Sequence, residues 1–167
     1  MKSIKKIALF FAVSMLAING MSQSTSDIVD LAAGSNDHST LVAAVKAADL
    51  VATLKGKGPF TVFAPTNAAF NALPAGTVDG LLKPEMKDQL TGVLTYHVVS
   101  GRLDSMELMK MIQAGGGMAK LKTEQGEELT VMMQGNGIGV KDSKGGVAMV
   151  TTKDVYQKNG VILVTIY

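Results

Sequence analysis

Few residues of this chain are suited to acid–base or nucleophilic chemistry, and they are widely spaced. The chain has two histidines, His38 and His97, and no cysteine. A serine or threonine nucleophile would need a histidine base beside it and a third group that orients the ring. His97 follows Tyr96 and is the better candidate base, but no Gly-x-Ser-x-Gly turn presents a nucleophile. The sequence therefore predicts no catalytic residue and a protein that is not an enzyme.

Other patterns that can carry chemistry are better explained by strands and turns. Glu127 and Glu128 are adjacent, and neighbours on a strand point to opposite faces, so they cannot share one glycosidic bond. The glycine-rich run from Gly135 to Gly139 lies between two strand-like segments and opens no helix, as a phosphate loop would. We predict a hairpin turn there and a second one over 142–146.

Metal ligands are also sparse. Two histidines without a cysteine provide none of the spacings that hold zinc, such as paired histidines one helical turn apart. His38 lies in the polar segment 35–39, where a solvated turn is the simpler interpretation. We therefore expect no metal and no cofactor.

Methionine is the abundant side chain with unusual binding properties, since the chain contains 11. Its flexible thioether fills irregular cores or lines adaptable grooves. We expect mainly core filling, and keep as an alternative function a methionine-rich groove that carries an apolar small molecule, a lipid or a pigment. The residues concerned are Met106, Met109, Met111, Met118, Met132 and Met133.

The elements that position these residues follow from apolar spacing and from turn residues. Helical segments are predicted over 28–32, 39–54, 68–73, 85–94 and 105–112. Asp27, Asp104 and either Thr66 or Asn67 are suited to cap helices. Strands are predicted over 61–64, 96–99, 120–123, 129–133, 138–141, 147–151 and 161–166, and the segment between Pro74 and Pro84 is predicted to be a connection. Helices in the N-terminal half and strands in the second half predict an α+β domain.

The N-terminus has the layout of a secretory signal peptide. Lys2, Lys5 and Lys6 precede an apolar run from Ile7 to Ile18, which is too short for a membrane anchor. We expect cleavage after Ser22, which leaves one mature domain over 23–167. The expected location is secreted or periplasmic, with no membrane span after cleavage.

Charge excludes a nucleic-acid partner. The full chain has 16 basic and 14 acidic residues, and removal of the three leader lysines leaves 13 basic residues, a formal charge of −1. Arg102 is the one arginine of the mature chain, so no cluster of arginines marks a basic face. The absence of cysteine also means that the core alone holds the exported domain together.

Three segments resemble the fasciclin domain family in both order and spacing. They are TVFAPTNAAF at 61–70, LTYHVV at 94–99 and NGVILV at 159–164. The opening DIVDL at 27–31 and the segment 39–58 are also similar, so the resemblance covers nearly the whole mature chain. It identifies the chain as a single-domain, secreted, bacterial member.

The resemblance implies a compact wedge of β-strands, a β-sandwich, flanked by helices, and a role in extracellular adhesion. It also carries an adhesion role onto Tyr96 and His97, although we interpret both as mainly structural because their rings can pack in the core while their polar atoms bind backbone groups. The other motif residues are expected to be mainly structural: Thr61, Phe63, Ala64, Pro65, Thr66, Asn67, Phe70, Asn159, Gly160 and Val161.

Two departures from the family pattern concern the last segment. Leu163 stands where relatives carry histidine, and the sequence stops at Tyr167, which predicts either a short final strand or an edge of that strand left for a partner to cover. The expected partner is a cell-surface or matrix protein or polysaccharide. Because a single module needs several copies for avidity, self-association is a further hypothesis.

Overall fold

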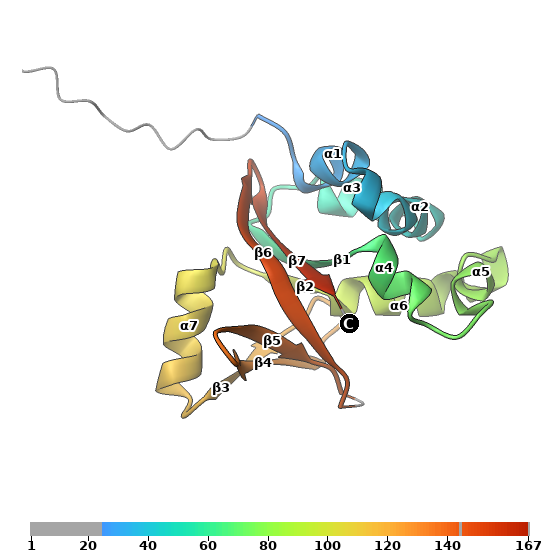
Figure 1. Cartoon of the computed structure of the whole chain (residues 1–167). Helices are drawn as coiled ribbons and strands as arrows, with labels where there is room; N and C mark the ends of the chain where they lie inside the picture. The colour runs from blue at the N-terminus through green and yellow to red at the C-terminus, as the bar shows by residue number, and fades with distance from the viewer. Residues whose placement is uncertain (1–24, 144, 167) are drawn as a thin grey trace, which may run out of the picture.

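A computed structural model of the chain describes residues 25–143 and 145–166. The predicted signal peptide, residues 1–22, lies outside the described residues. Helices occupy mainly the first half and strands the second half, which confirms the predicted α+β class (Figure 1). Within the described ranges, no helix combines the length and the apolar character needed to cross a bilayer.

The helical elements begin at the positions that capping residues favour. They are α1 (Ile28–Ala33), η1 (Asn36–His38), α2 (Ser39–Ala47), α3 (Val51–Leu54), α4 (Asn67–Asn71), α5 (Thr77–Leu81), η2 (Pro84–Met86), α6 (Lys87–Tyr96) and α7 (Ser105–Ala114). The side chains of Asp27, Thr66 and Asp104 accept hydrogen bonds from backbone N–H groups in the first turns of α1, α4 and α7. These caps are the ones expected from residue type.

Three local predictions were wrong. The single helix expected over 39–54 is broken between α2 and α3, where Asp49 adopts a left-handed φ of 60° that a continuing helix does not allow. The connection expected between Pro74 and Pro84 contains α5, which begins after Gly76 at a φ of 82°. The strand expected over 96–99 starts later, because Tyr96 ends α6 and His97 caps it.

The strands form one sheet among the described residues. They are β1 (Phe60–Pro65), β2 (Val98–Ser100), β3 (Met118–Lys122), β4 (Glu128–Gln134), β5 (Gly137–Lys141), β6 (Val147–Gln157) and β7 (Gly160–Ile166), in the order β2-β1-β7-β6-β5-β4-β3. Among the strands of residues 25–143 and 145–166, only β1 and β7 pair in parallel. The turns at 135–136 and 142–146 connect β4 to β5 and β5 to β6, as the glycines predicted.

The sheet curls so that its two end strands meet. Val99 in the middle of β2 bridges Thr123, which follows β3, and Glu124 N donates to Val98 O at 2.8 Å. The described residues therefore form a barrel-like sheet and not the β-sandwich that was expected. Strand β7 lies between β1 and β6, so the predicted open edge at the C-terminal strand was also wrong.

The two faces of the sheet carry two separate cores. One face of β1 and β7, with Val62, Ala64 and Ile162, packs against α1, α2 and α6. The opposite face, with Phe63 and Leu163, packs inside the curled sheet and against α7. In Figure 1, α7 accordingly lies on the other side of the sheet from α1 to α6.

Candidate functional site

Tyr96 is held in the second core by its ring and by its hydroxyl group. The residue is 9% exposed. Its hydroxyl donates to Glu128 O at 3.3 Å and accepts from Ser143 N at 3.1 Å, so it joins α6 to the start of β4 and to the β5–β6 turn. Burial raises the pKa of the phenol. Both hydrogen-bonding roles of the hydroxyl are thus used inside the domain.

His97 is fixed at the C-terminus of α6. Its Nδ1 lies 2.7 Å from Val93 O, and because a carbonyl oxygen only accepts, Nδ1 carries the proton of the neutral ring. The ring meets the Tyr96 ring edge-on, with centroids 5.8 Å apart. His97 O accepts from Phe63 N at 2.9 Å, and burial lowers the pKa of the imidazole. This histidine positions the helix end against β1.

The motif at 61–70 joins β1 to neighbouring segments through side-chain hydrogen bonds. The Thr61 hydroxyl, fully buried, donates to Gly101 O at 2.7 Å and accepts from Leu103 N at 2.8 Å. Asn67 Oδ1 accepts from Thr40 N at 3.0 Å, and its Nδ2 donates to Asn36 O and Ser39 Oγ at 2.8 and 2.9 Å. The motif therefore holds the loop after β2 and the start of α2.

The remaining side chains of this motif serve packing. Phe63, Ala64 and Pro65 are buried in β1, with Phe63 in the second core and Ala64 in the helical core. Thr66 caps α4, and Phe70 is half-buried against the helical core. None of these side chains is presented at the surface for recognition.

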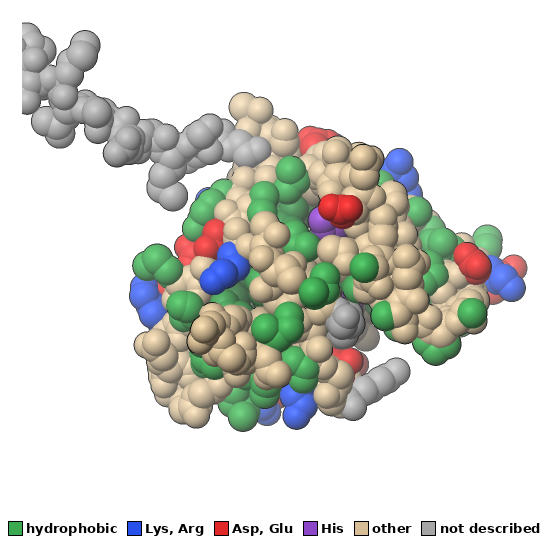
Figure 2. Space-filling model, in the orientation of Figure 1, with side chains coloured by type: hydrophobic (Ala, Val, Ile, Leu, Met, Phe, Trp, Pro, Cys, Tyr) green, Lys and Arg blue, Asp and Glu red, His purple; other side chains and the backbone are tan. Residues whose placement is uncertain are grey.

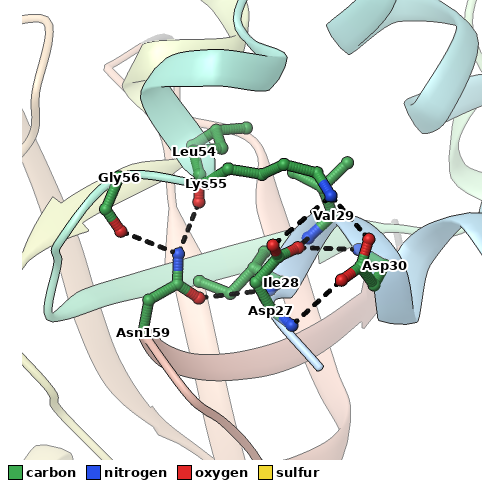
Figure 3. A network of polar contacts seen from close by, with 8 residues as sticks. All are labelled: Asp27, Ile28, Val29, Asp30, Leu54, Lys55, Gly56 and Asn159. Atoms are coloured by element: carbon green, nitrogen blue, oxygen red, sulfur yellow. Dashed lines mark hydrogen bonds and ion pairs between the residues drawn. The ribbon is translucent and has the colours of Figure 1, made fainter. Parts of the chain in front are cut away.

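The motif at 159–164 forms a second network of polar contacts, which Figure 3 shows from close by. Asn159 Nδ2 donates to Leu54 O at 2.6 Å and to Gly56 O at 3.2 Å, and its Oδ1 accepts from Ile28 N at 3.2 Å. A side chain on Gly160 would lie 2.1 Å from Phe60 O, so glycine is needed where β7 meets β1. Val161 is fully buried.

Beside this network, Lys55 links the start of α1 to the end of α3. Its Nζ lies 2.6 Å from Asp30 Oδ1 and 3.4 Å from Asp27 Oδ2. The hydrogen bond from Lys55 lowers the pKa of Asp30 and raises that of Lys55 itself. Together, these contacts of the motif residues join segments of the fold that are distant in sequence.

Tyr96 and His97, the residues closest to a catalytic pair in the sequence, are used in contacts within the domain. The hydroxyl of Tyr96 and Nδ1 of His97 bind backbone groups of the domain, as described above. Among the described residues, no three side chains of histidine, aspartate or glutamate gather closely enough to hold a metal ion.

The alignment of methionines in a row across the sheet is the feature that the sequence did not reveal. Across five neighbouring strands, Met118 lies opposite Met132, Met132 opposite Gly139, Gly139 opposite Met149, and Met149 opposite Ile166. Directly opposite residues share one face of a sheet. We call these five residues the methionine face. Met118 is 51% exposed and Ile166 39% exposed, while Met132 and Met149 are half-buried.

The methionine face continues the sheet face that the helices cover farther along. Ile166 alternates with Thr165 along β7 and so points to the same side as Ile162, which packs under the helices. In Figure 2, hydrophobic side chains reach the surface in the lower part of the view, near β4, β5 and β6, with basic side chains at the lower margin. The period-two alternation along each strand indicated which of its residues share a face. The sequence did not reveal the order in which the strands pair.

The methionines fill less of the core than expected, although Met109 and Met111 pack against the second core. None of those in the described part of the chain is buried. Gly139, at the middle of the face, is buried, because the side chains of Gln134, Val147 and Met132 close over it: a side chain there would lie 3.1, 3.3 and 3.5 Å from them.

An apolar cavity of about 80 Å³ lies elsewhere, between the helices and β1. Its walls include Val62, Phe70 and Leu94, with His97 at one side, and no methionine contributes to them. The alternative prediction placed an apolar molecule in a methionine-rich groove. The structure instead offers a small cavity under the helices.

A comparison with protein-family models matches residues 36–165 to the Fasciclin domain. The chain belongs to the fasciclin domain family. Its bacterial relatives include the Synechocystis protein sll1483, which is 49% identical over 151 residues, covering 89% of this chain and 76% of the relative. The immunogenic protein MPB70 of Mycobacterium bovis is 38% identical over 156 residues, covering 88% of this chain and 72% of that protein.

Longer animal proteins are also similar to this fasciclin domain. Rabbit transforming growth factor-beta-induced protein ig-h3 is 36% identical over 135 residues, which are 81% of this chain but 18% of that protein. Among solved structures, a FAS1 domain pair from the insect cell adhesion molecule fasciclin I matches with a TM-score of 0.75 over 86% of this chain and 50% of the pair. Sequence identity there is 17%, so this match supports the fold alone.

The substitution of Leu163 for the histidine expected from the fasciclin pattern has a simple structural consequence. Leu163 is fully buried and lies opposite Phe63 in the parallel pair of β1 and β7. An apolar side chain at this position packs in the second core and needs no hydrogen-bond partner.

Proposed function

We propose that this fasciclin domain is a non-catalytic, exported adhesion module that binds a protein of the cell surface or matrix through the methionine face. The proposal joins the predicted signal peptide, family membership and the methionine face, at which Met118 and Ile166 are exposed. Export to a secreted or periplasmic location, over a mature chain of residues 23–167, is part of the proposal.

The methionine face carries this proposal because exposed apolar surface is costly unless something covers it. Contiguous apolar patches on soluble domains mark contact sites, and methionine is enriched at protein interfaces because its side chain adapts to different partners. Lys120 and Lys141 lie in the next cross-strand row, on either side of Thr130, and add a polar rim. An apolar centre with a charged rim is typical of a protein–protein contact.

A protein partner fits this face better than a polysaccharide. Sugars are bound through many hydrogen bonds and through flat aromatic rings, whereas the face offers thioethers, and the chain has no tryptophan. Tyr96 and His97 support the fold from inside the domain and do not form the contact surface in this proposal. Self-association through the same face would supply the avidity that a single module lacks.

The test compares two methionine-to-lysine variants. Residues 23–167 are passed over surfaces coated with collagen, fibronectin or alginate and over intact cells, and saturable binding is recorded. Met132→Lys should weaken binding at least about tenfold, since a charge in the centre of an apolar contact costs more than 1.4 kcal/mol. Met106→Lys is the control, because Met106 lies on α7 and is already 65% exposed.

Each outcome of this experiment decides something. Equal binding by both variants would exclude the methionine face. Binding to alginate alone would favour the polysaccharide, and loss of binding in a folded Tyr96→Ala variant would restore the adhesion role of that residue. Sedimentation velocity of both variants shows whether the same substitution also abolishes self-association.

Carriage of an apolar small molecule is the second candidate, supported by the cavity between the helices and β1. Its volume of about 80 Å³ is smaller than the roughly 150 Å³ cavity that holds a benzene molecule. A lipid or pigment would therefore need α4 and α5 to move away from the core. Solvent extraction of protein purified from its native source, followed by mass spectrometry, tests this candidate: a stoichiometric apolar compound supports it.

A further inference from the structure

His38 contains a buried nitrogen that the fold leaves without a partner. Its Nδ1 lies 2.9 Å from Ser35 Oγ, but its Nε2 is buried and has no hydrogen-bond partner. It is the one buried side-chain nitrogen or oxygen in this condition within residues 25–143 and 145–166. Leaving such a group unsatisfied destabilises the folded domain. Burial also lowers the pKa of His38, which favours the neutral ring.

His38 lines a second apolar cavity, of about 120 Å³, on the helix-covered side of the sheet. The apolar walls are Leu31, Ala32, Ala64, Val155, Ile162 and Val164. Ser35 is the other polar residue of the lining, and its hydroxyl is paired with His38 Nδ1. Nε2 is therefore the one side-chain group of the lining that still lacks a hydrogen bond.

The chemistry of this cavity selects its occupant. A buried water normally makes two to four hydrogen bonds, and this lining offers one, so water is held poorly. Its volume of about 120 Å³ is smaller than the roughly 150 Å³ that holds a benzene molecule, so a single ring enters only with a small outward movement of the lining side chains. The best match is thus an apolar ring that carries one polar group.

A hydroxyl is the polar group that fits in either protonation pattern of the ring. The Ser35 hydroxyl can donate to Nδ1 or accept from it, so Nε2 is correspondingly a donor or an acceptor. A hydroxyl group both donates and accepts, and it pairs with Nε2 in both cases. We propose that this cavity is a binding site for a small phenol, with its hydroxyl bound to His38 Nε2 and its ring against Ile162 and Val164.

The two histidines of the chain make this proposal directly testable by nuclear magnetic resonance. Phenol and benzene are titrated separately into residues 23–167, and the ring Cε1–H signals of His38 and His97 are followed. Phenol should shift the His38 signal saturably and leave the His97 signal in place. Benzene should bind about tenfold more weakly, because it forfeits one hydrogen bond.

Two variants separate the hydrogen bond from the cavity itself. In His38→Leu, which removes Nε2, the preference for phenol over benzene should disappear, as followed by the methyl signals of Ile162. In Ala32→Leu, which fills the cavity from half-buried α1, neither compound should bind. Met106→Lys is the control, since Met106 lies on α7, is 65% exposed and does not line the cavity, and this variant should retain the preference.

The results that overturn the proposal are equally clear. If phenol causes no saturable shift of His38 in the unmodified chain, the cavity is not a phenol site. If phenol and benzene bind the unmodified chain equally, or if His38→Leu keeps the preference, Nε2 does not contact the hydroxyl. The site does not depend on the methionine face, so Met132→Lys should bind phenol normally.

Discussion

Asn159 Oδ1 accepts a hydrogen bond from Ile28 N across 131 positions of the chain, at 3.2 Å. The same amide group donates to the carbonyls of Leu54 and Gly56, so one side chain joins the first helix, the end of α3 and the β6–β7 turn. Segments that are distant in sequence meet at a single buried polar residue. The motif at 159–164 therefore stabilises the fold by joining these segments.

The first prediction concerns this amide. Asn159→Ala leaves Ile28 N and two carbonyl groups without their partner, and each such loss in a buried place costs about 1–3 kcal/mol before relaxation. We expect a loss of about 3 kcal/mol in the free energy of unfolding, measured by urea denaturation. Asn136→Ala, in the exposed β4–β5 turn, is the control and should change it by less than about 0.5 kcal/mol. Similar losses in both variants would contradict the prediction.

The second prediction concerns the close approach of β1 and β7. In Gly160→Ala, the new methyl group would lie 2.1 Å from Phe60 O and 2.8 Å from Ile28 Cδ1, so the parallel strands must separate. We expect a lower melting temperature and loss of more than about 2 kcal/mol. Gly80→Ala, inside α5 with open space around it, should instead be neutral or stabilise the domain by up to about 1 kcal/mol.

The third prediction separates stability from binding at Tyr96. Tyr96→Phe keeps the buried ring but removes the hydroxyl that joins Glu128 O and Ser143 N. The free energy of unfolding should fall by about 1–2 kcal/mol, because the interior bonds are lost. Binding to protein-coated surfaces should stay unchanged when measured well below the melting temperature. Loss of binding with unchanged stability would show instead that the hydroxyl contacts a partner.

The sequence predicted those features that depend on neighbouring residues. The caps at Asp27 and Asp104, the hairpin turns and the strand β1 follow from local chemistry, and they are present. The break at Asp49 escaped prediction, because its left-handed conformation leaves no mark in the apolar spacing of 39–54. The position of Tyr96 was missed for a similar reason, since its β-favouring neighbours outweigh the helix that precedes them.

The candidate sites depended on the topology and could not be seen in the sequence. Met118, Met132 and Met149 come together only because β3, β4, β5 and β6 pair in this order and register. In the same way, the cavity beside His38 needs α1 to pack over β6 and β7, although His38 looked like a solvated turn residue. Residue type indicated the chemistry, but the fold decided which residues meet.

The last prediction is a pH dependence of stability that comes from the histidines. Burial lowers the pKa of both His38 and His97 below the value of about 6.5 expected in the unfolded chain. At pH values below that, the unfolded chain binds more protons than the folded domain, so the free energy of unfolding falls as the pH decreases through 6.5. Asp30 and Asp104 also have lowered pKa values, but their contribution is present above about pH 4 and is lost only below it.

The range from about pH 7 to 5 therefore isolates the two imidazoles. Urea denaturation at steps across this range should show a steady loss of stability in the unmodified chain. The double variant His38→Gln with His97→Gln, in which neither side chain titrates, should give a nearly flat profile over the same range, because glutamine can still donate to Val93 O while carrying no charge. A flat profile in the unmodified chain would mean that the rings stay accessible to protons in the folded domain. A slope retained in the double variant would assign the pH dependence to the carboxylates.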